Sequence, residues 1–210
     1  SEARGLVTVG DPVTVAQTPH SMLGSKLAAR GLDNRVGAWV AAESLRRAAE
    51  SDAESTVYAV STVQEEVGLS GAKMVGYDLE PDAAVAVDVT HASDHPEFPG
   101  DRHAEVSLGD GPVISRGSGN HHALVEVVRE AADAAGIDVQ YQAAGIRTGT
   151  DADAFYTTRG GIPSLNLGLP QRYMHTPAEV VDLDDVEAAA DLLAAFARRV
   201  AGRQPFGIDR

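Results

Sequence analysis

The chain of 210 residues contains no cysteine. Disulfides and thiolate metal sites are therefore excluded, and any metal ion must be held by His, Asp or Glu. No apolar stretch approaches the roughly 20 residues that cross a bilayer, so we expect no membrane contact. Residues 1–10 lack the basic stretch and apolar core of a secretory leader. These absences predict a cytoplasmic protein.

Positive charge is also scarce, because Lys26 and Lys73 are the only lysines and the formal net charge is −14 at pH 7. Binding to nucleic-acid phosphates requires positive charge, so we expect no nucleic-acid partner. An acidic chain poor in lysine fits a salt-adapted organism, and it equally fits an ordinary protein from a GC-rich genome. The hydrophobic content of 43% is ample for a packed core.

Strand-like and helix-like patterns alternate after about residue 33. The patterns predict helices over 36–49, 68–77, 120–135 and 184–200, and strands over 56–63, 83–89, 138–143 and 162–169. The run 83–89 is almost continuously apolar, which is typical of a parallel strand covered on both faces. The alternation predicts an α/β fold, a three-layer α/β/α sandwich around a mostly parallel central sheet.

Residues 1–30 have a different pattern. Residues 6–15 alternate around Gly10, Asp11 and Pro12, which is a turn signal between two short β segments. This region is too short to fold alone. We therefore expect residues 1–30 to be the end of a separate β unit with its linker, and residues 31–210 to form the main domain.

Acidic residues and one histidine gather at the strand ends. In open α/β sheets, ligands bind beyond the carboxyl ends of the strands. Five candidates lie there: Asp33 ahead of the first helix, Glu65 and Glu66 after strand 56–63, Asp88 in strand 83–89, and His175 after strand 162–169. Carboxylate and imidazole ligands suit zinc, cobalt or manganese. The sequence therefore predicts a metal site at this edge.

Each candidate also has an ordinary explanation. Asp33 could cap the following helix, Asp88 could lie in a turn, and a lone histidine such as His175 is common on surfaces and in cores. The adjacent Glu65 and Glu66 are more informative, because carboxylates at the end of an apolar strand are costly unless they are paired or bind metal. One of the two could bind a metal ion while the other moves a proton.

Five segments together resemble the TET family of glutamyl (leucyl) dinuclear metallo-aminopeptidases. They are GLDNRVG at 31–37, TVQEEVG at 62–68, AVDVT at 86–90, GTDA at 149–152 and RYMHTPAE at 172–179. The match runs in order from about residue 5 to residue 200. The resemblance implies a zinc-peptidase, phosphorylase/hydrolase-like sandwich. It identifies residues 1–30 as the remnant of a small inserted β dimerisation domain and 31–210 as the catalytic domain.

The resemblance also implies a role for each candidate residue. Asp33 would bridge two divalent metal ions, zinc or cobalt first and manganese as the alternative. Asp88 would bind the first ion, Glu66 and His175 the second, and Glu65 would be the general base. The Asp33–Asn34 peptide would be cis. Capping of the next helix by Thr150 or Asp151 explains that segment, and no role follows for His91, His95, His103, His121 or His122.

In the family, the first ion also binds a histidine from a His-x-Asp motif far upstream of the bridging aspartate. His20, the only histidine before Asp33, lacks that context. The resemblance thus implies that this chain begins inside the end of the inserted domain, and that its first site holds only Asp33 and Asp88. The family forms large assemblies, so a homo-oligomer is expected for the longer parent.

The implied function is a metallo-aminopeptidase that removes N-terminal residues from peptides with a free N-terminus. Two metal ions would polarise the scissile carbonyl, and Glu65 would carry the proton of the attacking water to the leaving amine. Two alternatives remain open. One is a related carboxypeptidase or amidohydrolase on the same fold. The other is an inactive truncated chain that binds one metal ion or none.

Overall fold

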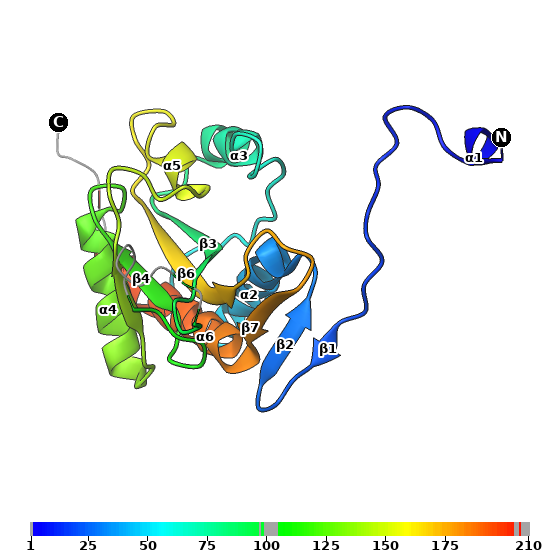
Figure 1. Ribbon diagram of the computed structural model, residues 1–210. Coiled ribbons are helices and arrows are strands. Elements are labelled where there is room, and N and C mark those ends of the chain that lie inside the picture. The colour runs from blue at the N-terminus through cyan, green and yellow to red at the C-terminus, as the bar shows by residue number, and fades with distance from the viewer. Residues whose placement is uncertain (1, 97, 99–104, 204–205, 207–210) are drawn as a thin grey trace.

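Helices cover both faces of a central sheet in the computed structural model, which describes residues 2–96, 98, 105–203 and 206 (Figure 1). One layer holds α2 (Leu32–Ala49), α4 (His122–Ala135) and α6 (Leu183–Val200), and α6 packs against both of the others. The opposite layer holds α3 (Ser70–Leu79) and α5 (Ala152–Phe155). The predicted three-layer α/β/α architecture is confirmed.

The sheet is mixed. Its strands are β1 (His20–Ser21), β2 (Lys26–Ala29), β3 (Ala84–His91), β4 (Val113–Arg116), β5 (Gln140–Ala143), β6 (Ser164–Arg172) and β7 (Glu179–Asp182). Their order is β1-β2-β7-β6-β4-β5, and β3 also pairs with β6. Within the described residues, β3–β6 and β4–β5 are parallel and the other pairings are antiparallel. The expectation of a mostly parallel sheet was wrong, because the short strands β2, β4 and β7 carry too few residues to show a pattern.

Two apolar clusters lie on the two faces of the sheet. The larger contains Leu165, Leu167 and Leu169 of β6, all fully buried, with side chains of α2, α4 and α6. The smaller joins α3, β3 and α5. Side chains alternate along a strand, so Ala84 of β3 packs in the smaller cluster while Val89 packs in the larger. Asp88 lies four residues after Ala84, so its side chain points to the same face of the sheet, the one that α3 and α5 cover.

Local sequence features define the start of α6 and the end of α4. The Asp182 carboxylate accepts a hydrogen bond from the Asp184 amide, 3.1 Å away, which caps α6. Gly136 ends α4 with a φ of 66°, a conformation that glycine adopts without strain.

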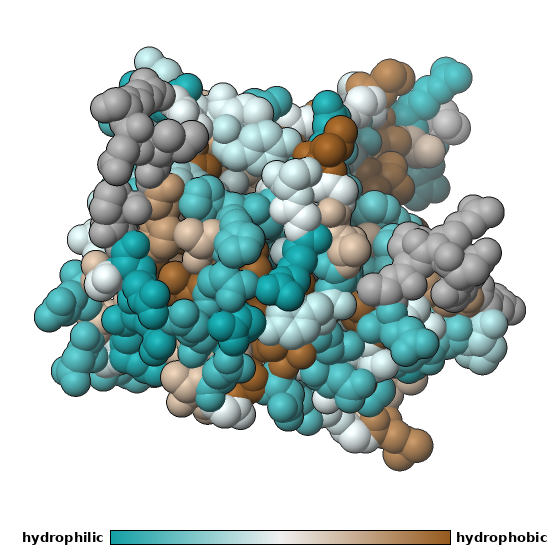
Figure 2. Space-filling view, turned by 90° about the vertical axis from the view of Figure 1, so that its left-hand side faces the viewer, coloured by the Kyte–Doolittle hydropathy of each residue, from teal (hydrophilic) through white to brown (hydrophobic). Residues whose placement is uncertain are grey.

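The molecular face shown in Figure 2 is largely hydrophilic. On α4, Arg129 pairs with Glu126 and Asp133, as expected of a solvated helix surface.

Segment 56–63, predicted as a buried strand, forms no helix or strand and pairs with no strand among the described residues. Tyr58 and Val63 are 62% and 65% exposed. Residues of this segment and residues of β3 line the same cavity, which has a volume of about 920 Å³. β-Branched and aromatic residues fit a sheet, but a strand forms only where a partner takes up its backbone hydrogen bonds. The prediction failed because composition does not specify that partner.

The two β segments expected within residues 6–15 are also absent. A short helix, α1 (Ala3–Leu6), precedes an exposed extended stretch, and Val9 and Val13 are almost fully exposed. The expected turn is present, since the Asp11 amide donates to the Thr8 carbonyl over 3.1 Å. β1 and β2 form a hairpin that joins the main sheet through β7. A domain boundary at residue 30 stays a prediction.

Across the described part of the chain, no helix combines the length and apolar character that crossing a membrane would require.

Candidate metal centre

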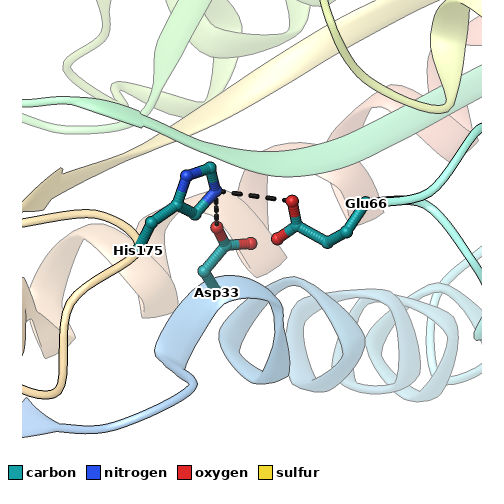
Figure 3. A group of neighbouring side chains, drawn as sticks. All are labelled: Asp33, Glu66 and His175. Carbon is teal, nitrogen blue, oxygen red and sulfur yellow. Dashed lines mark ion pairs between the residues drawn. The ribbon is translucent and has the colours of Figure 1, made fainter.

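Three of the five predicted residues, Asp33, Glu66 and His175, point toward one another (Figure 3). The His175 Nε2 atom lies 3.1 Å from Asp33 Oδ2 and 3.4 Å from Glu66 Oε2. One ligand atom from each residue lies within 4.8 Å of the others. A divalent ion bound at about 2.0–2.3 Å from each donor fits such a spacing. We call this group the metal triad.

The triad is assembled from segments far apart in sequence. Asp33 lies at the start of α2, Glu66 in the loop before α3, and His175 in the loop between β6 and β7. The Asp33 side chain is only 9% exposed, whereas Glu66 and His175 are 59% and 63% exposed. The triad therefore has one buried carboxylate at its base and two side chains open to solvent.

The start of α2 is fastened to β3 by Asn34. The Asp33–Asn34 peptide is cis, as the resemblance implies. The Asn34 Nδ2 atom donates to the Val87 carbonyl over 2.7 Å, and Asn34 Oδ1 accepts from the Gly37 amide over 2.9 Å. Because Val87 precedes Asp88, this contact sets the spacing between Asp33 and Asp88. We call it the Asn34 clasp.

The clasp leaves no room for a side chain at position 37. A Cβ atom there would lie 2.2 Å from Asn34 Oδ1 and 2.5 Å from the Val87 carbonyl oxygen. We expect Gly37→Ala to lower the free energy of unfolding by about 1–3 kcal/mol, the usual cost of overpacking. Thermal unfolding measures this. Gly145→Ala is the matched control, because a Cβ at position 145 meets no atom within 4 Å. Equal stability of the two variants would contradict the clasp.

Asp88 and Glu65 lie outside the triad but line the same cavity as Asp33 and Glu66. Asp88 is 9% exposed, and its Oδ1 accepts from the Val89 amide over 2.8 Å. Burial raises the pKa of Asp88 to about 8 and that of Glu65 to about 7, and neighbouring carboxylates add to both shifts. All predicted site residues except His175 thus line one cavity, and His175 contacts two of them.

The cavity concentrates negative charge without compensation. Burial and the charge of Glu66 raise the pKa of Asp33 to about 6. Among the described residues that line the cavity, none is a lysine or arginine. Carboxylates pressed together without a cationic side chain are stabilised by a bound metal ion. The donor set and its electrostatics therefore fit a divalent cation.

Asp151 is a cavity residue that the sequence interpretation missed. It lies at the N-cap of α5, but its side chain accepts no hydrogen bond from that helix, whereas Thr150 Oγ1 accepts from the Ala152 amide over 3.3 Å. Asp151 Oδ2 accepts from the Thr62 hydroxyl, and its buried Oδ1 has no partner within the described structure. Its charge contributes to the raised pKa of Glu65. Its position in the GTDA segment at 149–152 is the sequence feature that could have indicated a place in the site.

Among the described residues, the remaining histidines and Arg172 do not belong to the metal triad. His103 lies outside the described residues. The His95 ring lies 5.1 Å from the Tyr173 ring. Arg172 pairs with Asp94 through two hydrogen bonds of 2.7 Å, which fastens the end of β6 to the loop after β3.

The α/β/α sandwich thus carries a candidate metal site made of carboxylates and a histidine beside the strand ends. The sequence model of the M42 glutamyl aminopeptidase family matches residues 1–192. The chain belongs to this family.

Curated and solved relatives agree with this membership. The chain is 34% identical over 166 residues to the lysyl aminopeptidase of Pyrococcus furiosus, covering 79% of this chain and 46% of that protein. It is 33% identical over 181 residues to the glutamyl aminopeptidase of Lactococcus lactis, covering 86% and 50%. The structure of the Pyrococcus horikoshii TET1 peptidase matches with a TM-score of 0.79 and 31% identity, covering 93% and 57%. The chain thus spans about half the length of these relatives.

Proposed function

We propose that the protein is an aminopeptidase that releases N-terminal residues from peptides at a dinuclear metal site. The carrying observation is the metal triad, of which Asp33 and Glu66 line one cavity together with Glu65, in a chain of the M42 family. The relatives named above are lysyl and glutamyl aminopeptidases, so the preferred first residue differs between family members. The proposal leaves that preference open for this chain.

In this proposal Asp33 would be a ligand of both ions, Glu66 and His175 would complete the second site, and Asp88 would belong to the first. Zinc or cobalt suits these ligands best, with manganese as the alternative. When bound, the ions would polarise the scissile carbonyl and lower the pKa of water. Asp33 is suited to a bridging role, because it contacts His175 and its charge also acts on Asp88 and Glu65.

Glu65 is the proposed general base. It lines the same cavity as Asp33 and Glu66, and the charges of both act on it, but it does not belong to the triad. No cationic side chain among the described lining residues holds it in an ion pair. This setting supports a role in which Glu65 takes a proton from water and returns it to the leaving amine.

The test compares matched peptides with free and acetylated N-termini on the metal-loaded chain. We expect hydrolysis of the free peptides alone, release of their first residue, and loss of turnover when a chelator removes the metal. Equal hydrolysis of acetylated peptides would favour an amidohydrolase, and release of C-terminal residues would favour a carboxypeptidase. Bound metal without turnover on any substrate would favour the truncated, inactive chain.

We also propose that residues 1–30 end an inserted β domain and that the longer parent forms a homo-oligomer. The Pyrococcus horikoshii TET1 peptidase assembles into a tetrahedron or an octahedral shell. In this chain the exposed apolar residues of the first 30 include Val9, Val13 and Leu23, each more than 90% exposed. Apolar side chains exposed to this extent support contact with further protein.

A further inference from the structure

One buried carboxylate near the triad has no role in the proposed reaction. Glu179, the first residue of β7, is 3% exposed. Its Oε2 atom accepts hydrogen bonds from the Leu32 amide over 2.6 Å and from the Asp33 amide over 3.2 Å. Among the described residues no lysine or arginine forms an ion pair with it. A buried carboxyl group held, among the described residues, by two backbone amides calls for an explanation.

We propose that Glu179 is a positioning residue that fixes the Asp33 carboxylate relative to His175. This inference rests on the proposed metal centre. Glu179 follows His175 by four residues, and it binds the backbone of the residue that the His175 ring contacts. A single side chain thus joins the segment that carries one ligand to the segment that carries another.

The strand that carries Glu179 is itself firmly placed. Glu179 pairs with Ala29 in the β2–β7 ladder, and Val180 pairs with Arg172 of β6. The hydrogen bond to the Asp33 amide transfers this fixed position to the start of α2. Groups that orient metal ligands in this way typically contribute 10- to 100-fold to metal affinity.

Helix capping is the competing explanation. The Leu32 and Asp33 amides lack intrahelical partners, and a carboxylate near a helix N-terminus is favourable. The residue before the helix, Gly31, has no side chain to cap it. Capping alone predicts a loss of stability when Glu179 is removed. Positioning predicts, in addition, weaker and altered metal binding in protein that is still folded.

Asp185 provides a matched control. It is 2% exposed and likewise accepts hydrogen bonds from two backbone amides, those of Gly109 and Gly111, each over 2.8 Å. It does not line the cavity. Glu179→Ala and Asp185→Ala therefore each remove a buried carboxyl group that accepts hydrogen bonds from two backbone amides. Only the Glu179 carboxyl group binds the backbone of a triad residue. Glu179→Gln keeps an oxygen atom in place for the two amides.

The experiment titrates Co²⁺ into the metal-free 210-residue chain and records the visible absorption bands, which report the donors around the ion. Circular dichroism selects a temperature at which every variant is folded. We expect Glu179→Ala to weaken Co²⁺ binding by about 10- to 100-fold and to change the bands. Asp185→Ala should stay within about twofold of the unmodified chain, and Glu179→Gln should recover most of the affinity.

Two results would overturn the inference alone: Glu179→Ala binding Co²⁺ as tightly as the unmodified chain, or Asp185→Ala losing as much affinity as Glu179→Ala. Absence of Co²⁺ binding by the unmodified chain would overturn the metal centre, and the positioning role with it.

Discussion

Replacing Glu65 by glutamine is expected to lower peptide turnover by about 10²- to 10⁴-fold while leaving the metal content unchanged. Glutamine keeps the size of the side chain but cannot accept the proton of water. Glu65 is not one of the triad ligands, so metal binding should survive. The measurement pairs initial rates on a peptide with a free N-terminus with the number of bound metal ions per chain after dialysis.

Two further variants make this experiment specific. Glu66→Gln removes a triad ligand and should lose metal and turnover together. Glu54→Gln makes the same chemical change at an exposed glutamate elsewhere on the cavity lining, and its turnover should stay within about twofold. Unchanged turnover in Glu65→Gln would remove Glu65 from the mechanism. Loss of metal from that variant would make it a ligand instead.

The candidate site was more predictable than the elements that carry it. Asp33, Glu66 and His175 are brought together as the motifs imply, although segment 56–63, expected to deliver Glu66, is not a strand. A metal ligand can lie on a loop, provided that the backbone of the loop is held in a fixed position. Here the Leu69 amide, bonded to the Gln64 carbonyl over 2.9 Å, closes the turn that holds Glu66.

The predicted strands 83–89, 138–143 and 162–169 correspond to β3, β5 and β6, each of which pairs with another strand. β3 pairs with β6 over its full length, from Ala84 opposite Ser164 to His91 opposite Gln171. The shorter β4 and β7 gave no periodic signal, since four residues are too few to define an alternation. Parallel or antiparallel pairing could not be predicted from the sequence either, because it depends on which strands become neighbours in the folded sheet.

Side chains that hold the ligands in place were also invisible in the sequence. Glu179 lies in a motif used for the resemblance, yet its role depends on two amides that are nearly 150 residues away in the chain. The sequence predicts that Thr150 or Asp151 caps the next helix, since both residue types are common caps, and Thr150 has that role. Only the fold shows that the Asp151 carboxylate lines the cavity instead.

The stability of the metal-free chain is expected to fall as the pH rises from 5 to 8, and bound metal should reverse that trend. Burial raises the pKa of Asp33 to about 6, Glu65 to about 7 and Asp88 to about 8, above reference values of 3.8, 4.5 and 3.8. In this range the folded chain binds more protons than the unfolded chain, so the free energy of unfolding decreases with pH. The stabilisation is complete below the unfolded-state values and is lost as the pH passes through 6 to 8.

The expected size is roughly 3–6 °C in unfolding temperature for each cavity carboxyl and each pH unit. One pKa unit corresponds to about 1.4 kcal/mol, and about 1 kcal/mol shifts the unfolding temperature of a chain of this size by roughly 2–4 °C. A divalent ion binds the ionised carboxylates of the folded state. At a free concentration 100 times its Kd, it adds about 2.7 kcal/mol of stability, and its affinity rises with pH because it competes with protons.

Thermal unfolding at pH 5, 6, 7 and 8, in chelator and in zinc at constant ionic strength, measures both trends. The net charge of −14 also makes the chain less stable at high pH, and burial raises the pKa of Asp185, outside the cavity, to about 6. Asp88→Asn separates these contributions, because it removes the most strongly shifted cavity carboxyl and leaves Asp185 in place. That variant should show a flatter profile in chelator. A profile as steep as that of the unmodified chain, or zinc without effect at pH 8, would show that the cavity carboxylates do not govern the stability and do not hold the ion.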